Sequence, residues 1–294
     1  MFRRILFPTD FSTYANTVFD CLPSLKTMGV EEVVLANIIR MGDTLFAETY
    51  NRESFHYMRW SVEEQLNVQR MALEGQGFKV ITRTGCGFPG KEIARLAFEE
   101  KADLIVLGAQ GTSLSSELML GSTAFEIIRE TLAPVLLLQA EVVRALGHVK
   151  CRWNCAEMFR RILHPTDFST CADQALDLLD RLASERMEEA LILHVQDERA
   201  MKHRPPEQIA EFDRIDQERL AERCQKIQRK GVRVRTMIRR GIPFQETLKA
   251  AEDEKVTLII LGSQGRSAVQ ELITGSTLEN VARLSRLPVL IVRA

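Results

Sequence analysis

Glycine, serine and threonine recur at identical spacing in two stretches of the chain, residues 108–123 and residues 262–277. In each stretch a glycine is followed after two residues by a second glycine, and after nine more residues by Gly-Ser-Thr. Glycine lets backbone N–H groups approach an anion without a Cβ atom in the way. A helix that begins after the last glycine adds unpaired N–H groups and the positive end of its dipole. The pattern therefore favours the binding of phosphate.

The rest of the chain must position these two glycine stretches, and it too is duplicated. Residues 1–13 and 158–170 agree at twelve of thirteen positions, and the exception is Phe7 against His164. A chain of 294 residues with such a repeat favours two domains, each large enough for its own core. The boundaries that we predict are residues 1–140 for the first domain, 141–157 for a linker and 158–294 for the second domain.

Strand and helix patterns alternate within each half. Strands are expected at residues 2–7, 33–39, 79–84, 104–107 and 135–138, and after the repeated opening at 190–195, 232–238, 258–261 and 289–292. Helical patterns lie between the strands, and residues 45–75 and 206–230 are the longest. This order is typical of a parallel sheet covered on both faces. We predict the α/β fold class, with two doubly wound domains that each hold a five-stranded parallel sheet with helices on both faces.

Asp10 and Asp167 follow the first strand of each half within a Pro-Thr-Asp triplet. In an open parallel sheet, ligands collect at the carboxyl ends of the strands, where the strand order reverses. We therefore expect each aspartate to face the same crevice as its glycine stretch, where it can accept from a ribose hydroxyl or an adenine amino group. The alternative is that the triplet only ends a strand and caps the next helix, for which Ser12 is itself a suitable N-cap. Repetition beside the same glycine spacing favours a role in binding.

The composition argues against several classes of protein. A formal net charge of -1 and a pI near 6.6 give no reason to expect sequence-independent binding of nucleic acid. We expect no secretory signal peptide in the first residues, and no apolar run approaches the length that spans a membrane. We expect a cytoplasmic protein without a membrane partner. The six cysteines are sparse and are expected to remain thiols.

Together these residues resemble the universal stress protein family, and the resemblance covers both halves. The halves open with Arg-Arg-Ile-Leu-Phe-Pro-Thr-Asp-Phe-Ser and Arg-Arg-Ile-Leu-His-Pro-Thr-Asp-Phe-Ser. The nucleotide-binding motif of the family, G-x2-G-x9-G-[ST], is intact at Gly108, Gly111, Gly121 and Ser122 and at Gly262, Gly265, Gly275 and Ser276. The Leu-His-Val ending of the second strand is present as Leu193-His194-Val195, whereas the first half has Ala36-Asn37-Ile38.

The resemblance implies two flavodoxin-like domains of the adenine nucleotide α-hydrolase-like kind that bind ATP or AMP, and Mg²⁺ can accompany ATP. By that similarity Asp10 and Asp167 would contact adenosine, and the backbones of Ile38 and Val195 would reach the adenine edge. The other residues expected to line the two sites are Pro8, Thr9, Leu107, Pro165, Thr166 and Leu261. The glycines would hold ribose and phosphates together with Ser122, Thr123, Ser276 and Thr277.

Neither glycine stretch is a Walker A motif, because neither has the Gly-Lys-Ser/Thr ending that places a lysine on the outer phosphates. Nor is a general base evident near a γ-phosphate, since Glu117 and Glu271 read as solvated loop carboxylates. We therefore expect binding, with hydrolysis slow if present. The alternatives are a slow ATPase or an adenylylating enzyme of the same fold group, and a structural duplicate without a ligand.

The two sites are not expected to be equivalent. Arg266 is the cation of the second glycine stretch, where the first has Thr112. A charge-assisted contact from Arg266 predicts stronger discrimination of ATP from AMP at the second site.

His148, Cys151 and Cys155 in the linker are three metal-ligand types without a fourth, so we predict no metal site. Members of the family usually dimerise through the last strand. The two halves are therefore expected to form that pair within one chain, and further homodimerisation is left open.

Overall fold

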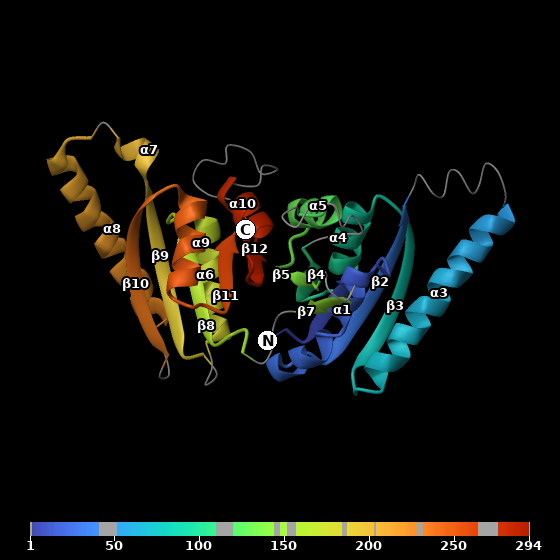
Figure 1. Ribbon diagram of the computed structural model, residues 1–294. Coiled ribbons are helices and arrows are strands. Elements are labelled where there is room, and N and C mark those ends of the chain that lie inside the picture. The colour runs from blue at the N-terminus through green and yellow to red at the C-terminus, as the bar shows by residue number, and fades with distance from the viewer. Residues whose placement is uncertain are drawn as a thin grey trace. The chain divides into compact units, whose positions relative to one another are not determined.

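The computed structural model describes residues 2–40, 52–109, 120–143, 148–151, 157–183, 187–202, 204–227, 232–263 and 276–293. The chain separates into two compact units, Met1–Arg152 and Trp153–Ala294, each of which is described by itself (Figure 1).

The first unit holds five parallel strands in the order β5-β4-β1-β2-β3. The strands are β1 (Arg4–Pro8), β2 (Glu32–Arg40), β3 (Lys79–Gly87), β4 (Leu104–Gly108) and β5 (Val135–Leu138). The helices are α1 (Thr13–Phe19), the 3-10 helix η1 (Leu22–Met28), α3 (Arg52–Glu74), α4 (Pro89–Glu99) and α5 (Ser122–Glu130). Helices α4 and α5 pack against each other on one face of the sheet, and α3 lies on the other (Figure 1).

The second unit repeats this arrangement, with five parallel strands in the order β10-β9-β8-β11-β12. Its strands are β8 (Arg161–Thr166), β9 (Glu189–Asp197), β10 (Arg233–Gly241), β11 (Leu258–Gly262) and β12 (Val289–Val292). Its helices are α6 (Thr170–Leu182), α7 (Glu198–Met201), α8 (Pro206–Ile227), α9 (Pro243–Asp253) and α10 (Ser276–Leu284). The predicted fold class, with two flavodoxin-like domains that each carry a five-stranded parallel sheet, is confirmed.

The central strands are apolar throughout because helices cover both of their faces. Ile5, Leu6 and Phe7 of β1 are almost fully buried, as are the side chains of β4 up to Leu107. The helix after β1 begins where the sequence predicts it, since Ser12 Oγ accepts a hydrogen bond from Ala15 N at 3.1 Å. This N-cap fixes the direction in which the chain leaves β1.

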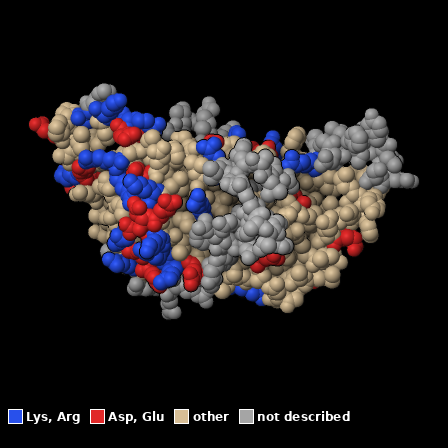
Figure 2. Space-filling view, in the orientation of Figure 1, with Lys and Arg blue, Asp and Glu red and all other residues tan. Residues whose placement is uncertain are grey.

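A glutamate of the second strand ties together the first three strands of each sheet at their amino ends, and in the second unit it is buried. Glu189 accepts hydrogen bonds from Arg161 at 2.6 Å and from Arg235 at 2.5 Å. Burial acts to raise the pKa of the Glu189 carboxyl, but the two arginines outweigh it and leave the pKa below its ordinary value. Glu32 takes the same place in the first unit. Figure 2 shows that basic and acidic side chains are intermixed over the second unit, so its visible face has no large patch of one sign.

The segment expected to be a linker contains an antiparallel hairpin, β6 (Ala140–Val143) and β7 (His148–Cys151), which belongs to the first compact unit. Helix α1 packs beside β7. The predicted domain boundaries at residues 140 and 158 stay predictions.

Cys21 departs from the expectation that the cysteines are thiols. Cys86, Cys171 and Cys224 form no disulfide, but Cys21, which lies just beyond α1, is disulfide-bonded. The expectation that all the cysteines are thiols is therefore wrong for Cys21. Its sequence neighbours gave no sign of a disulfide.

Candidate functional site

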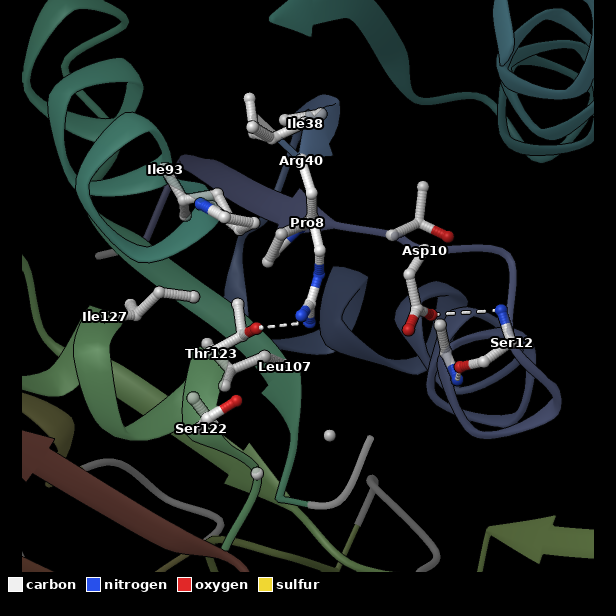
Figure 3. A pocket seen from close by; sticks show the side chains of 17 residues that line it. Pro8, Asp10, Ser12, Ile38, Arg40, Ile93, Leu107, Ser122, Thr123 and Ile127 are labelled. Atoms are coloured by element: carbon white, nitrogen blue, oxygen red, sulfur yellow. Dashed lines mark hydrogen bonds between the residues drawn. The ribbon is translucent and has the colours of Figure 1, made fainter. Parts of the chain in front are cut away.

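A pocket of about 190 Å³ opens in the first unit at the carboxyl ends of β1 and β4, the two strands between which the strand order reverses (Figure 3). This is the position at which open α/β sheets bind their ligands. The lining residues are Pro8, Thr9, Asp10, Ser12, Ala15, Ala36, Ile38, Arg40, Pro89, Ile93, Leu107, Gly108, Gly121, Ser122, Thr123, Ala124 and Ile127.

This pocket brings together residues that the sequence analysis singled out separately. The lining includes Pro8, Thr9, Asp10, Ile38, Leu107, Gly108, Gly121, Ser122 and Thr123. Gly111 lies outside the described residues. The Pro-Thr-Asp triplet and the ends of the glycine stretch therefore face one crevice, as expected.

Asp10 does not cap the helix that follows it. Its Oδ1 accepts a hydrogen bond from Ser12 N at 3.0 Å, while the helix is capped by the Ser12 hydroxyl (Figure 3). No other hydrogen bond or ion pair involves the Asp10 carboxylate in the part of the chain that the structure describes. The carboxylate is exposed and keeps further acceptor capacity at the rim of the pocket.

The first turn of α5 supplies the opposite side of the pocket. Gly121 is the N-cap, and it provides no side-chain acceptor for the N–H groups of that turn. Gly121 N donates to Ala109 O at 2.9 Å, which fixes the beginning of α5 beside the end of β4. Ser122 and Thr123, the first two residues of α5, also line the pocket (Figure 3). Such a donor set fits a phosphate.

Several lining residues were not found from the sequence. Pro89, Ile93 and Ile127 come from α4 and α5 and add apolar side chains to the lining. Ile93 and Ile127 lie on the same side of the pocket (Figure 3). Arg40, the last residue of β2, also lines the pocket, and its Nη2 lies 3.4 Å from Thr123 Oγ1. The sequence signal that could have identified Arg40 is a charged residue at the carboxyl end of an apolar strand.

The second unit has a larger pocket, about 650 Å³, at the equivalent place. Among its lining residues are the predicted Pro165, Thr166, Asp167, Val195, Leu261, Gly262, Ser276 and Thr277. Gly265, Arg266 and Gly275 lie outside the described residues. The pocket extends to α7, α8 and the segment between them. The lining residues there, which were not predicted, are Arg199, Met201, Arg204, Phe212, Ile215, Asp216 and Arg219.

His194 belongs to β9, and it lines this pocket. Its Nδ1 lies 2.8 Å from the carbonyl oxygen of Thr166, and because a carbonyl can only accept, Nδ1 is the donor. The Nε2 atom lies 3.4 Å from Asp216 Oδ2, which also accepts from Gln196 at 3.0 Å. The ring packs on Phe168 with 4.4 Å between centroids. His194, Gln196 and Asp216 thus form a polar side of the second pocket.

Asp197 ends β9 and is engaged by a neighbouring arginine. Arg199 Nε donates to Oδ1 at 2.9 Å and Arg199 Nη2 donates to Oδ2 at 2.5 Å. These hydrogen bonds hold the pKa of the Asp197 carboxyl below its ordinary value, so the pair is ionised at neutral pH.

The comparisons with known proteins give one consistent result. The model of the universal stress protein family matches residues 1–139 and 158–293. The universal stress protein MJ0577 of Methanocaldococcus jannaschii is 35% identical over 155 residues, which cover 46% of this chain and 96% of that protein. The universal stress protein YxiE of Bacillus subtilis is 34% identical over 148 residues and is covered completely, again by 46% of this chain.

A solved structure matches nearly the whole chain. A universal stress protein from Archaeoglobus fulgidus is similar with a TM-score of 0.70 and 26% sequence identity, and the match covers 99% of this chain and 97% of that one. The single-domain relatives each match about half of the chain, in agreement with the two matches of the family model.

Proposed function

Because the chain belongs to the universal stress protein family, we propose that each of its two domains binds one adenine nucleotide, ATP or AMP. The protein acts in stress response or regulation by binding the nucleotide rather than by fast catalysis. The cytoplasmic location expected from the sequence stays a prediction; no helix in the described ranges is long and apolar enough to span a bilayer.

One observation carries this proposal. In each unit a pocket lies at the switch point of the sheet and is lined by both a Pro-Thr-Asp triplet and the Ser-Thr pair of a glycine stretch. A carboxylate for hydroxyl or amino groups thus lies opposite a helix N-terminus suited to phosphate. An adenosine phosphate carries both kinds of group at its two ends.

The residues of the first pocket fit the parts of such a ligand. Ile38, Ile93 and Ile127 offer apolar contact for the adenine ring, and the backbone of Ile38 can pair with its edge. Asp10 can accept from the ribose hydroxyls. The first turn of α5, with Ser122 and Thr123, holds the phosphates. In the second pocket Asp167, Val195, Ser276 and Thr277 take the same roles.

The stoichiometry of nucleotide binding tests this proposal. The full chain is denatured, the released nucleotide is identified by mass spectrometry, and the stripped protein is titrated with ATP and AMP in a calorimeter, with and without Mg²⁺. We expect about two sites per chain, one for each domain.

Gly121→Val and Gly275→Val are the matching variants. Gly121 has φ -61° and ψ 143°, a conformation that valine adopts without strain, so the substitution adds a side chain where phosphate approaches and leaves the backbone unstrained. Each single variant should lose one site and the double variant should lose both, while the melting temperature without ligand stays near that of the wild type. Two sites in the double variant would refute the proposal. Steady release of phosphate from ATP would favour the ATPase alternative.

A further inference from the structure

Arg40 reaches from the end of β2 across the first pocket to the first turn of α5 (Figure 3). Its guanidinium lies within 3.4 Å of Thr123 Oγ1. Throughout the described ranges no carboxylate forms an ion pair with Arg40. The arginine side chain is exposed, so it is free to change rotamer toward a ligand.

This position is unusual for a cation. The N-terminus of a helix carries partial positive charge, which stabilises anions and disfavours cations. Helix α5 has no side-chain cap of its own, so its first turn and Arg40 make the same space electropositive from two sides. Asp10 is the one carboxylate among the described residues that line the pocket, and it lies at the β1 side. An anion between Arg40 and α5 would satisfy both groups.

The second unit has the opposite charge at the same place. Glu32 and Glu189 are equivalent, because each lies opposite the equivalent arginine of the first strand. Arg40 stands eight residues after Glu32 and Asp197 eight residues after Glu189, so Arg40 and Asp197 are equivalent too. The charge of Asp197 is already neutralised by the guanidinium of Arg199, which donates to both carboxylate oxygens. The end of β9 therefore offers no unpaired cation to a ligand.

We propose that Arg40 is a specificity-determining residue of the first site, where its guanidinium binds the outer phosphates and selects ATP over adenosine. This inference rests on the proposed function, since it assigns a role within the same site. The cation expected for the second site is Arg266, from a different element. Each site would thus hold the phosphates with its own arginine. Arg40 therefore offsets the stronger discrimination of ATP from AMP that Arg266 alone would give the second site.

The test isolates the first site in the full chain. With Gly275→Val disabling the second site, the affinities for adenosine, AMP and ATP are measured by calorimetry for wild-type Arg40, Arg40→Gln and Arg40→Lys. Arg40→Gln should weaken ATP by about tenfold, because a charge-assisted contact is lost, and leave adenosine within about twofold. Arg40→Lys should retain part of the ATP affinity, because lysine keeps the charge but not the planar fork. Arg59→Gln, at an exposed arginine of α3, is the matched control and should change nothing.

The salt dependence gives a second readout. Raising the ionic strength should weaken ATP binding more in the wild type than in Arg40→Gln. Salt screens the attraction between Arg40 and the phosphates, and the variant lacks this attraction. If Arg40→Gln lowers the affinities for adenosine and ATP equally, Arg40 has only a structural role and the inference is overturned. A gain in ATP affinity would overturn it too, because Arg40 would then block the site. If adenosine and ATP both fail to bind even with Arg40 present, the proposed function itself is wrong.

Discussion

Asn37 and His194 occupy equivalent positions in the two domains and make the same hydrogen bond. Asn37 Nδ2 donates to Thr9 O at 2.8 Å, and His194 Nδ1 lies 2.8 Å from Thr166 O. Both threonines immediately precede the aspartate at the pocket. An amide N–H thus replaces an imidazole N–H, so the departure of the first half from the Leu-His-Val pattern keeps the contact between the first and second strands.

This equivalence predicts the outcome of exchanging the two side chains. His194→Asn should retain the hydrogen bond to Thr166, whereas His194→Leu leaves a carbonyl in the buried strand end without its donor. We expect His194→Leu to lower the free energy of unfolding by about 1–3 kcal/mol and His194→Asn to cost less. Urea denaturation of both variants checks this. Asn37→Leu is the parallel variant in the first domain, and equal losses for His194→Asn and His194→Leu would contradict the equivalence.

The two pocket aspartates are predicted to serve ligand recognition. Asp10→Ala and Asp167→Ala should each weaken nucleotide binding at their own site by about 1–3 kcal/mol, the scale of a lost partner to a polar ligand group. Stability without ligand should change little, because Ser12 caps the helix after Asp10. Calorimetric titration and thermal melting together separate the two effects.

Ser169→Ala supplies the matched control for Asp167→Ala. Ser169 Oγ accepts from Ala172 N at 3.3 Å as the N-cap of α6, and Ser169 is not among the residues that line the second pocket. Its loss should cost about 1 kcal/mol of stability and leave the affinity unchanged. If Asp167→Ala behaves like Ser169→Ala, the aspartate belongs to the fold and not to the site.

The fold and much of each pocket could be predicted because the relevant signals are local and occur twice. Apolar runs such as residues 104–107 identify buried strands, and the alternation with helices then places the strand ends on one edge of a sheet. The triplet at Asp10 and the glycine at 121 could be assigned to that edge without knowing any contact between them.

The residues that escaped prediction depend on distant packing. Arg40 matters because its side chain spans the pocket to Thr123, a residue 83 positions away. His194 and Asp216 meet only once α8 lies against β9. Cys21 likewise gave no local sign of its disulfide. Periodicity and spacing carry no information about such partners.

The final strands carry a prediction about the assembly of the two domains. Strand β5 pairs with β4, and β12 pairs with β11, and both strands are buried and apolar. An apolar strand at the edge of a sheet exposes unpaired N–H and C=O groups to aggregation, which pairing of the two edges within one chain would remove. Cysteines introduced by Leu137→Cys and Leu290→Cys are therefore expected to crosslink within the monomer. Crosslinks found only between chains, or two separated lobes in small-angle scattering, would contradict this arrangement.

His164 makes the stability of the second domain depend on pH. It stands where the first half has Phe7, is fully buried, and hydrogen-bonds through Nδ1 to Ile260 O at 3.0 Å, while Nε2 has no partner among the described residues. Burial lowers the pKa of His164 from 6.5 to about 4, against weaker opposing effects of the Ile260 carbonyl and Asp173. The unfolded chain therefore binds a proton between these two pH values that the folded chain excludes.

The sign and size of this effect follow from proton linkage. Above about pH 6.5 the histidine is neutral in both states, and as the pH falls toward 4 the folded state is progressively destabilised. A pKa difference of roughly 2.5 gives a loss of stability on the order of 3 kcal/mol, which is complete below about pH 4.

Urea denaturation at pH 7, 6, 5 and 4.5 should show this loss in the wild type, and His164→Phe should remove it, because phenylalanine cannot be protonated. Any pH dependence that remains in His164→Phe comes from the other titrating groups, chiefly carboxylates, which both proteins share. Phe7→His should import the same dependence into the first domain, and parallel curves for the wild type and His164→Phe would show that His164 has no such role.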